Sequence, residues 1–359
     1  MASALAREFG FNHALAGLLT TGIFFTHAGM QIPGGHLVDK LGSHRVLVAA
    51  MAWVALGNFA IALSNAYWQL LFWKIFVGVG TGTCFVAGAR YVNEALAGPR
   101  LHFAQGLYGG SILLGSGFVI LAVPRLFAWT GWRGAFVVTA VVATAAWLLW
   151  MIAAPRVPQS PHPTGRFRGM LLAPELWLLG LMQMASFGLA IVAGAWIVTL
   201  LSGSLGIAAA QAGLIGSLVL LLGIVTRPLG GVLVRRMGVR VLLAASFVMN
   251  AFGCLVLGSG WSSLPLAILA VVLLGTGYGL PYAALFTRAA ALFPGRAGAA
   301  MGLVNMLGIV MILVGAPAAG RLADWTGSFR PSFLALGGFS LVACAATLLL
   351  NRDEPSPAL

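Results

Sequence analysis

About eleven apolar segments, each roughly 20 residues long, follow one another along this sequence with only short polar stretches between them. A helix of that length spans the hydrocarbon core of a bilayer. Of the 359 residues 60% are hydrophobic and only 8% are charged, whereas a soluble domain carries about 25% charged residues. We therefore predict an all-α integral membrane protein with about eleven transmembrane helices. The segments are 13–32, 46–63, 68–94, 102–123, 132–153, 174–201, 209–233, 240–260, 264–292, 297–318 and 331–350.

The sequence repeats itself with an offset of 196 positions. A polar stretch from Gln31 to Arg45 is echoed by a second stretch from Arg227 to Gly238. Internal repeats in a membrane protein are typical of secondary transporters. The offset relates Gly34 to Gly230, Gly35 to Gly231, Gly42 to Gly238, and Arg125–Gly131 to Arg321–Gly327.

The repeat and the basic residues predict the organisation of the chain. Thirteen Lys and Arg residues lie on the side of the first polar stretch and five on the other, so this stretch is predicted to face the cytoplasm. The Pro- and Arg-rich stretch 154–173 is predicted to be a cytoplasmic loop between two pseudo-symmetric bundles, residues 1–153 and 174–359. The counterpart of segment 174–201 would fall at or before the start of this sequence. We therefore expect the first half to lack its first helix, through truncation or a late start.

Residues Gly34–Arg45 resemble the cytoplasmic signature loop between helices 2 and 3 of the major facilitator superfamily, and the stretch from Gly230 is similar to its looser copy between helices 8 and 9. Trp132–Phe136 and Gly320–Gly327 resemble outer-loop segments of the same family. The resemblance implies two six-helix bundles that alternate between inward-open and outward-open states around a central cavity. In the family's counting, 1–153 would hold helices 2 to 6 and 174–359 helices 7 to 12, with helix 1 missing.

The resemblance also implies that the signature loop is a conformational latch. Adjacent glycines let two helix backbones approach closely. Asp39 precedes a helix that is predicted to begin near Val46, and its carboxylate could accept charge-assisted hydrogen bonds and favour a helix N-terminus. The alternative is a solvated loop whose charges only fix the topology. The latch residues are Gly34, Gly35, Asp39, Lys40, Gly42 and Arg45, with Gly230, Gly231, Arg235 and Arg236 in the second copy, where Arg235 replaces Asp39.

Arg227 is the strongest candidate for binding a substrate. It precedes Arg235 by eight residues, which places it about 12 Å inside one end of a helix, where an ionisable group is costly and usually functional. Its planar guanidinium suits nitrate, carboxylate or phosphate. The alternative is an arginine bonded to backbone carbonyls. The repeat places Gln31 at the equivalent depth, with His27 one turn before it.

The nitrate/nitrite porters of this family have an arginine at both of these positions, so Arg227 matches them and Gln31 departs from them. Lys74 occupies the place of an arginine in a helix 4 motif of the family, although it could equally extend to the membrane surface. Tyr278 and Asn305 are further candidates. The remaining one is Tyr108, and such tyrosines more often pack between helices.

We predict a secondary active transporter that works by alternating access and moves a small solute, with a small anion as the preferred class. The alternatives are a proton-coupled drug or metabolite efflux antiporter and an inactive or sensory membrane protein of the same fold. An efflux antiporter would need a carboxylate on the missing helix, since no Asp or Glu lies deep in a predicted span.

The sequence does not predict an enzyme, because it contains no nucleophile–base pair or nucleotide motif. Cys84, Cys254 and Cys344 lie in apolar segments without metal-ligand spacing, so neither a metal nor another cofactor is expected. The expected partners are the solute, a coupling proton or ion, and the lipid bilayer, with no nucleic acid. We expect a monomer in the cytoplasmic membrane of a prokaryote.

Overall fold

The computed structural model describes residues 8–10, 13–96, 98–157, 167–260 and 263–350. In these ranges all regular structure is helical, as the apolar segments predicted. A helix satisfies its backbone hydrogen bonds internally, which the interior of a membrane requires. Within the described ranges nine helices are long and apolar enough to cross a membrane. The total of eleven stays a prediction.

Contacts divide the chain into two compact units. Unit 1 comprises Met1–Ala95, Gly115–Gly165 and Phe293–Gly302, and unit 2 comprises Leu96–Leu114, Arg166–Leu292 and Leu303–Leu359. Two short segments, 96–114 and 293–302, thus group with the half of the chain to which they do not belong in sequence. The bundle boundaries at 153 and 174 stay a prediction.

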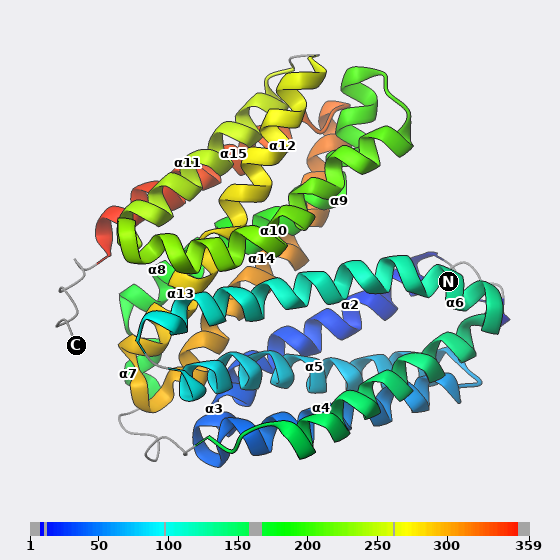
Figure 1. The fold of residues 1–359 in the computed structure, drawn as a ribbon. Helices are drawn as coiled ribbons and strands as arrows, with labels where there is room; N and C mark the ends of the chain where they lie inside the picture. The colour runs from blue at the N-terminus through cyan, green and yellow to red at the C-terminus, as the bar shows by residue number, and fades with distance from the viewer. Residues whose placement is uncertain (1–7, 11–12, 97, 158–166, 261–262, 351–359) are drawn as a thin grey trace. The chain divides into compact units, whose positions relative to one another are not determined.

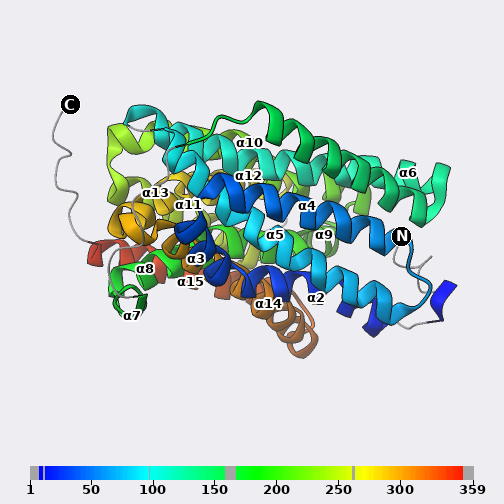
Figure 2. The same ribbon diagram turned by 90° about the horizontal axis from the view of Figure 1, so that it is seen from below.

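In unit 1 the central helix is α5 (Tyr67–Ala95), which packs against both α2 (His13–Gly29) and α4 (Ser43–Ala62). Figures 1 and 2 show α5 beside α4 in both views. Their shared core is apolar and includes Leu19, Ile61, Leu70, Val77 and Trp132. The remaining helices of the unit are α3 (Gln31–Leu41), the later part of α6 (Pro99–Ala153), the short η2 (Pro294–Arg296) and the first residues of α14 (Ala297–Thr326).

In unit 2 the helix α11 (Val239–Gly258) packs against α12 (Leu264–Gly279) and α15 (Arg330–Ala346), which run alongside it in Figure 1. The core includes Leu189, Ile197, Cys254, Val271 and Phe333. The other elements are α7 (Phe167–Leu171), α8 (Pro174–Gln183), the π-helical turn η1 (Met184–Gly188), α9 (Leu189–Leu205), α10 (Ala209–Met237), α13 (Pro281–Leu292), η3 (Thr347–Leu349), the first part of α6 and most of α14.

The signature stretch, which was expected to be a loop over 33–45, is almost entirely helical. Helix α3 continues to Leu41, and α4 begins at Ser43 rather than near Val46. Only Gly42 interrupts the two helices, with φ of 86°, a conformation that glycine adopts without steric cost. Pro33 lies in the first turn of α3, where a proline is tolerated. The stretch is therefore a sharp corner between two helices.

The backbone repeats this geometry at the offset seen in the sequence. Six of the eight glycines with a positive φ in the described residues form three pairs separated by 196 positions, with nearly equal φ angles within two of the pairs. Each pair marks a turn between or within helices, so the two halves change direction at equivalent points. The pairs are Gly10 (65°) with Gly206 (64°), Gly42 (86°) with Gly238 (75°), and Gly131 (69°) with Gly327 (70°).

Candidate functional site

Helix α3 approaches the start of α14 so closely that only glycine fits between them. A Cβ on Gly35 would lie 2.5 Å from the carbonyl carbon of Gly298 and 2.6 Å from the nitrogen of Ala299. A Cβ on Gly302 would lie 2.7 Å from the carbonyl carbon of Gln31. Real Cβ atoms essentially never come within 3.0 Å of another heavy atom. These two helices are therefore in direct backbone contact.

Unit 2 contains the same contact between α10 and the start of α6. A Cβ on Gly231 would lie 2.5 Å from the carbonyl carbon of His102, and one on Gly106 would lie 2.7 Å from that of Arg227. Each of these residues is offset by 196 from its counterpart in the first contact. The glycines of both polar stretches thus serve helix–helix contacts, as small residues do in membrane proteins.

Asp39 accepts hydrogen bonds from the N-terminus of α14. The backbone N–H of Gly298 donates to Oδ1 at 2.9 Å and that of Ala299 donates to Oδ2 at 3.0 Å. Arg90 places its Nε 3.9 Å from Oδ1. A carboxylate at this position satisfies free N–H groups and complements the helix dipole. We expected Asp39 to favour the N-terminus of the helix that follows it, and the structure places it on α14 instead.

Asp39 is nearly inaccessible, with 1% of its side chain exposed. It lies outside the nine apolar spans. Burial raises the pKa of its carboxyl above the ordinary value, while the two N–H donors, Arg90 and His36 oppose that rise. The ionised form is thus stabilised by these four groups and destabilised by lost hydration. This balance makes Asp39 sensitive to any separation of α3 from α14.

Of the other predicted latch residues, two glycines lie in close contacts between helices and the basic residues lie at the surface. Gly34 faces Thr83, and a Cβ on Gly230 would lie 2.8 Å from the carbonyl carbon of Leu280. The four basic residues are exposed, so they take no part in this tight packing. They are Lys40, Arg45, Arg235 and Arg236.

In unit 2, Arg227 lies in an aromatic cage. Its side chain is buried, with 2% of the residue exposed, and its Nη1 donates to the carbonyl oxygen of Gly109 at 2.7 Å. The guanidinium lies 4.4 Å from the ring centre of Tyr282 and 5.7 Å from those of Tyr278 and Phe187. Cation–π contacts of this kind stabilise a desolvated arginine without neutralising its charge.

Part of the cage is left without hydrogen-bond partners. Among the described residues, neither Nε of Arg227 nor the hydroxyl of Tyr282 has a partner, although both atoms are buried. A buried donor that forms no hydrogen bond is costly. The two groups can therefore supply a positive charge and two donors to an anion. Tyr278 contributes only its ring, because its hydroxyl donates to the carbonyl oxygen of Leu220 at 3.0 Å.

In unit 1, the structure brings His27 and Gln31 together. Gln31 Nε2 donates to the carbonyl oxygen of His27 at 3.3 Å, and His27 Nδ1 lies 3.0 Å from Oγ1 of Thr81. Gln31 is fully buried, and its Oε1 has no partner within the described part of the chain. An unpaired amide oxygen attracts a donor or a cation, so this pair can position a protonated or polar group of a solute.

The remaining predicted residues lie in other surroundings. Lys74 has its Nζ 4.9 Å from the ring centre of Phe136, in unit 1. Asn305 is buried in unit 2, where its Oδ1 accepts a hydrogen bond of 3.5 Å from Gln183. Tyr108 is half-buried on the first part of α6. The binding roles of these three residues stay predictions.

Two members of these groups were missed in the sequence. Phe187 completes the cage from the π-helical turn η1, and Gln183 holds Asn305. A phenylalanine in an apolar segment gives no signal of its own, and a π-helical turn cannot be read from hydrophobic periodicity. Gln183 could have been noticed, because it is a buried polar residue in a predicted span.

Comparison with known proteins gives the family. The model of the Major Facilitator Superfamily matches residues 1–198 and 176–359. The chain is 24% identical to the probable nitrate/nitrite antiporter NarK1 of Thermus thermophilus, over 92% of this chain and 82% of the relative. It is 25% identical to the probable sulfoacetate transporter SauU of Cupriavidus necator, over 98% of this chain and 88% of the relative.

A solved structure shares the fold. The fucose:proton symporter FucP of E. coli superposes with a TM-score of 0.79, at 17% identity, over 95% of this chain and 92% of that protein. The helical fold, the repeated backbone corners and the match of the family model along both halves agree with one another. The chain belongs to the Major Facilitator Superfamily.

Proposed function

We propose that this protein is a secondary transporter of a small anion and that Arg227 binds the anion. The observation that supports this most is the buried guanidinium, which has an aromatic cage and no carboxylate within the described contacts. Burying a charge without a counter-ion costs free energy, and binding of an anionic solute would offset that cost.

The relatives favour the same class of solute. The names of NarK1 and SauU specify nitrate or nitrite and sulfoacetate, which are all small anions. Nitrate and a sulfonate present oxygens in a plane or a tripod, and a guanidinium can bind either through two N–H groups. Arg227 supplies the one positive charge among the described contacts of the cage, so we propose a monovalent anion or one whose second charge is met elsewhere.

Membership of the family supports a transport cycle of alternating access. We propose that bundles 1–153 and 174–359, joined by 154–173, alternate between two states. The contact of Asp39 with α14 would stabilise one state and break in the other, driven by a proton or ion gradient or by exchange. The named bacterial relatives support a place in a prokaryotic cytoplasmic membrane.

Anion binding by the purified protein tests the proposal. Thermal-shift titrations with nitrate, nitrite, sulfoacetate and chloride should identify at least one anion that raises the melting temperature of the wild type. Arg227→Ala should weaken its apparent affinity about 10–100-fold, because a charge-assisted hydrogen bond contributes about 1.5–3 kcal/mol.

The control is Arg168→Ala, which removes an exposed positive charge on α7. Equal anion affinity in Arg227→Ala and Arg168→Ala would overturn the proposed site.

A further inference from the structure

A second basic site lies at the corner between α3 and α4, in unit 1. A cavity of about 630 Å³ is lined by Ser43, His44, Arg45, Glu94 and Arg156 among others. It lies at the end of the bundle that is predicted to face the cytoplasm. The transport proposal does not use this cavity.

The charge of the cavity is positive. Arg45 and Arg156 are both exposed and free of described ion pairs. The carboxylate in the cavity, Glu94, already pairs with Arg90 at 3.1 Å and accepts a hydrogen bond from Ser43. Two arginines therefore remain to attract an anion.

His44 also lines this cavity, and its ring lies beside those of Tyr91 and Trp150. Its Nε2 atom is buried and has no hydrogen-bond partner in the part of the chain that the structure describes. The first turn of α4 also lies here, without a side-chain cap, so its free N–H groups favour negative charge. These N–H groups add to the positive potential that the two arginines create in the cavity.

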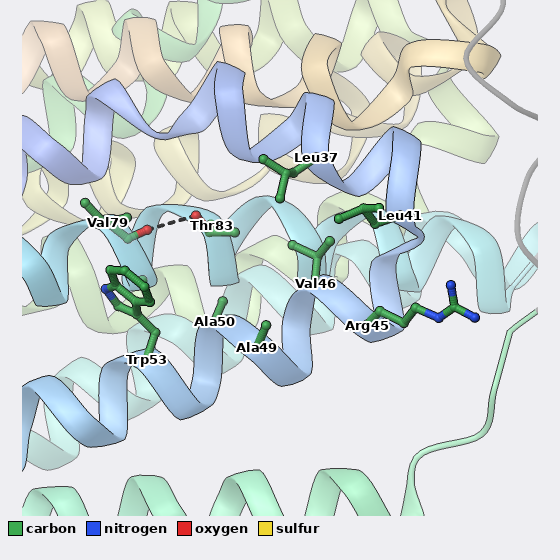
Figure 3. Close-up of a pocket in the computed structure, with 10 residues that line it drawn as sticks. Leu37, Leu41, Arg45, Val46, Ala49, Ala50, Trp53, Val79 and Thr83 are labelled. Atoms are coloured by element: carbon green, nitrogen blue, oxygen red, sulfur yellow. Dashed lines mark hydrogen bonds between the residues drawn. The ribbon is translucent and has the colours of Figure 1, made fainter.

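An apolar groove adjoins this cavity on the neighbouring face of α4. It has a volume of about 240 Å³, and its lining includes Leu37, Leu41, Val46, Ala49 and Trp53. Figure 3 shows the leucines entering from α3 and Trp53 from α4, with the guanidinium of Arg45 extending away from the groove. Arg45 lines both hollows. An apolar hollow and a cationic hollow thus meet at one arginine.

We propose that an anionic phospholipid binds here, with its phosphate between Arg45 and Arg156 and an acyl chain in the apolar groove. A soluble phosphate ester could use only the cationic hollow, and an uncharged lipid only the groove. The helices around the groove belong to a membrane protein, so acyl chains are the apolar molecules that surround it. Arginine near a membrane surface attracts anionic headgroups.

The bound lipid would adjoin the contact between Asp39 and α14. Glu94 lines the cavity and pairs with Arg90, and Arg90 in turn lies 3.9 Å from Asp39. A headgroup in this cavity is therefore connected to the carboxylate of Asp39, which binds α14, through the Glu94–Arg90 ion pair.

Lipid binding to the full-length protein in detergent tests the proposal. Native mass spectrometry would compare phosphatidylglycerol, phosphatidylcholine with the same acyl chains, and glycerol 3-phosphate. Phosphatidylglycerol should bind most tightly. Arg45→Gln and Arg156→Gln should each weaken its binding about fivefold, since a basic residue near the membrane surface contributes about 1 kcal/mol. Both arginines are exposed, so folding should not suffer.

The controls separate charge from packing. Arg168→Gln removes an exposed arginine elsewhere and should leave binding of phosphatidylglycerol unchanged. Ala49→Trp would fill the groove and should weaken that binding without affecting the melting temperature of the lipid-free protein.

Equal binding of phosphatidylglycerol and phosphatidylcholine would overturn the proposal, as would equal binding by wild type and Arg156→Gln. Binding of glycerol 3-phosphate as tight as that of the lipid would also overturn it, in favour of a soluble phosphate ester.

Discussion

Gly35→Ala should weaken the contact between α3 and α14 more than any other single methyl group added to α3. The new Cβ would lie 2.5 Å from the carbonyl carbon of Gly298 and 2.6 Å from the nitrogen of Ala299. Both neighbours are backbone atoms and cannot rotate away. Ordinary contacts of a Cβ begin at 3.4 Å, so the helices must separate by about 1 Å.

The cost has two parts. Adding a methyl group to a tight contact destabilises by about 1–3 kcal/mol. The same separation would lengthen the bonds from Gly298 and Ala299 to Asp39, now 2.9 and 3.0 Å, beyond hydrogen-bonding distance. Alanine regains about 0.5–1 kcal/mol through its better helix propensity. We expect a net loss of about 2–4 kcal/mol.

Thermal unfolding of the purified variants measures this loss. The matched control is Gly29→Ala at the end of α2, where a Cβ would meet nothing within 4 Å. Gly29→Ala should unfold at or slightly above the temperature of the wild type, and Gly35→Ala several degrees below it. If both variants unfold at the same temperature, the close backbone contact and the reasoning built on it are wrong.

Four further predictions concern single side chains. Tyr282→Phe should lower anion affinity about fivefold without loss of stability, since its hydroxyl is buried without a partner in the described residues; titration of both proteins with the best anion checks this, and equal affinity would exclude the hydroxyl from the site. Glu175→Gln should lower the free energy of unfolding by roughly 2 kcal/mol, because Glu175 lies 2.5 Å from Arg288 and both side chains are mostly buried. Thermal unfolding measures this loss, and the control Asp324→Asn, at an exposed carboxylate, should show none. Gly231→Ala should destabilise as Gly35→Ala does, because its Cβ would lie 2.5 Å from the carbonyl carbon of His102, and unfolding at the wild-type temperature would contradict the repeated contact. Burial raises the pKa of Asp39 above the ordinary 3.8. The stability that its protonated carboxyl contributes is therefore complete below pH 3.8 and is lost as the pH rises through the folded-state pKa. The melting temperature of the wild type relative to that of Asp39→Asn should fall over this pH range, and a rise would show that the folded-state pKa is lowered instead.

The class of fold and its repeat could be predicted because both are local properties of the sequence. Apolar length predicts membrane helices, and an offset of 196 is visible in the residues themselves. Gly42 and Gly238 were recognised in the polar stretches, and the structure gives both a positive φ. The helical course of 33–41 was missed, since glycine and proline usually indicate a loop but here serve a helix start and a close contact.

The partners of the functional residues were harder to predict. Asp39 contacts residues that follow it by about 260 positions, and no local pattern encodes such a distance. For Arg227 the buried position was predicted from its depth, and Tyr278 was named with it. The cage itself needed Phe187, whose contribution depends on how η1 turns one side chain toward the arginine. Packing of this kind is a tertiary property.

Transport by the purified protein in liposomes is the most direct test of the account. Vesicles loaded with the unlabelled form of the best-binding anion should accumulate its labelled form through the wild type. Arg227→Lys keeps the charge and loses the planar pair of N–H groups, so exchange should fall at least about tenfold. Exchange by Arg227→Lys at the wild-type rate, with both proteins inserted equally, would contradict the claim that Arg227 binds the transported anion.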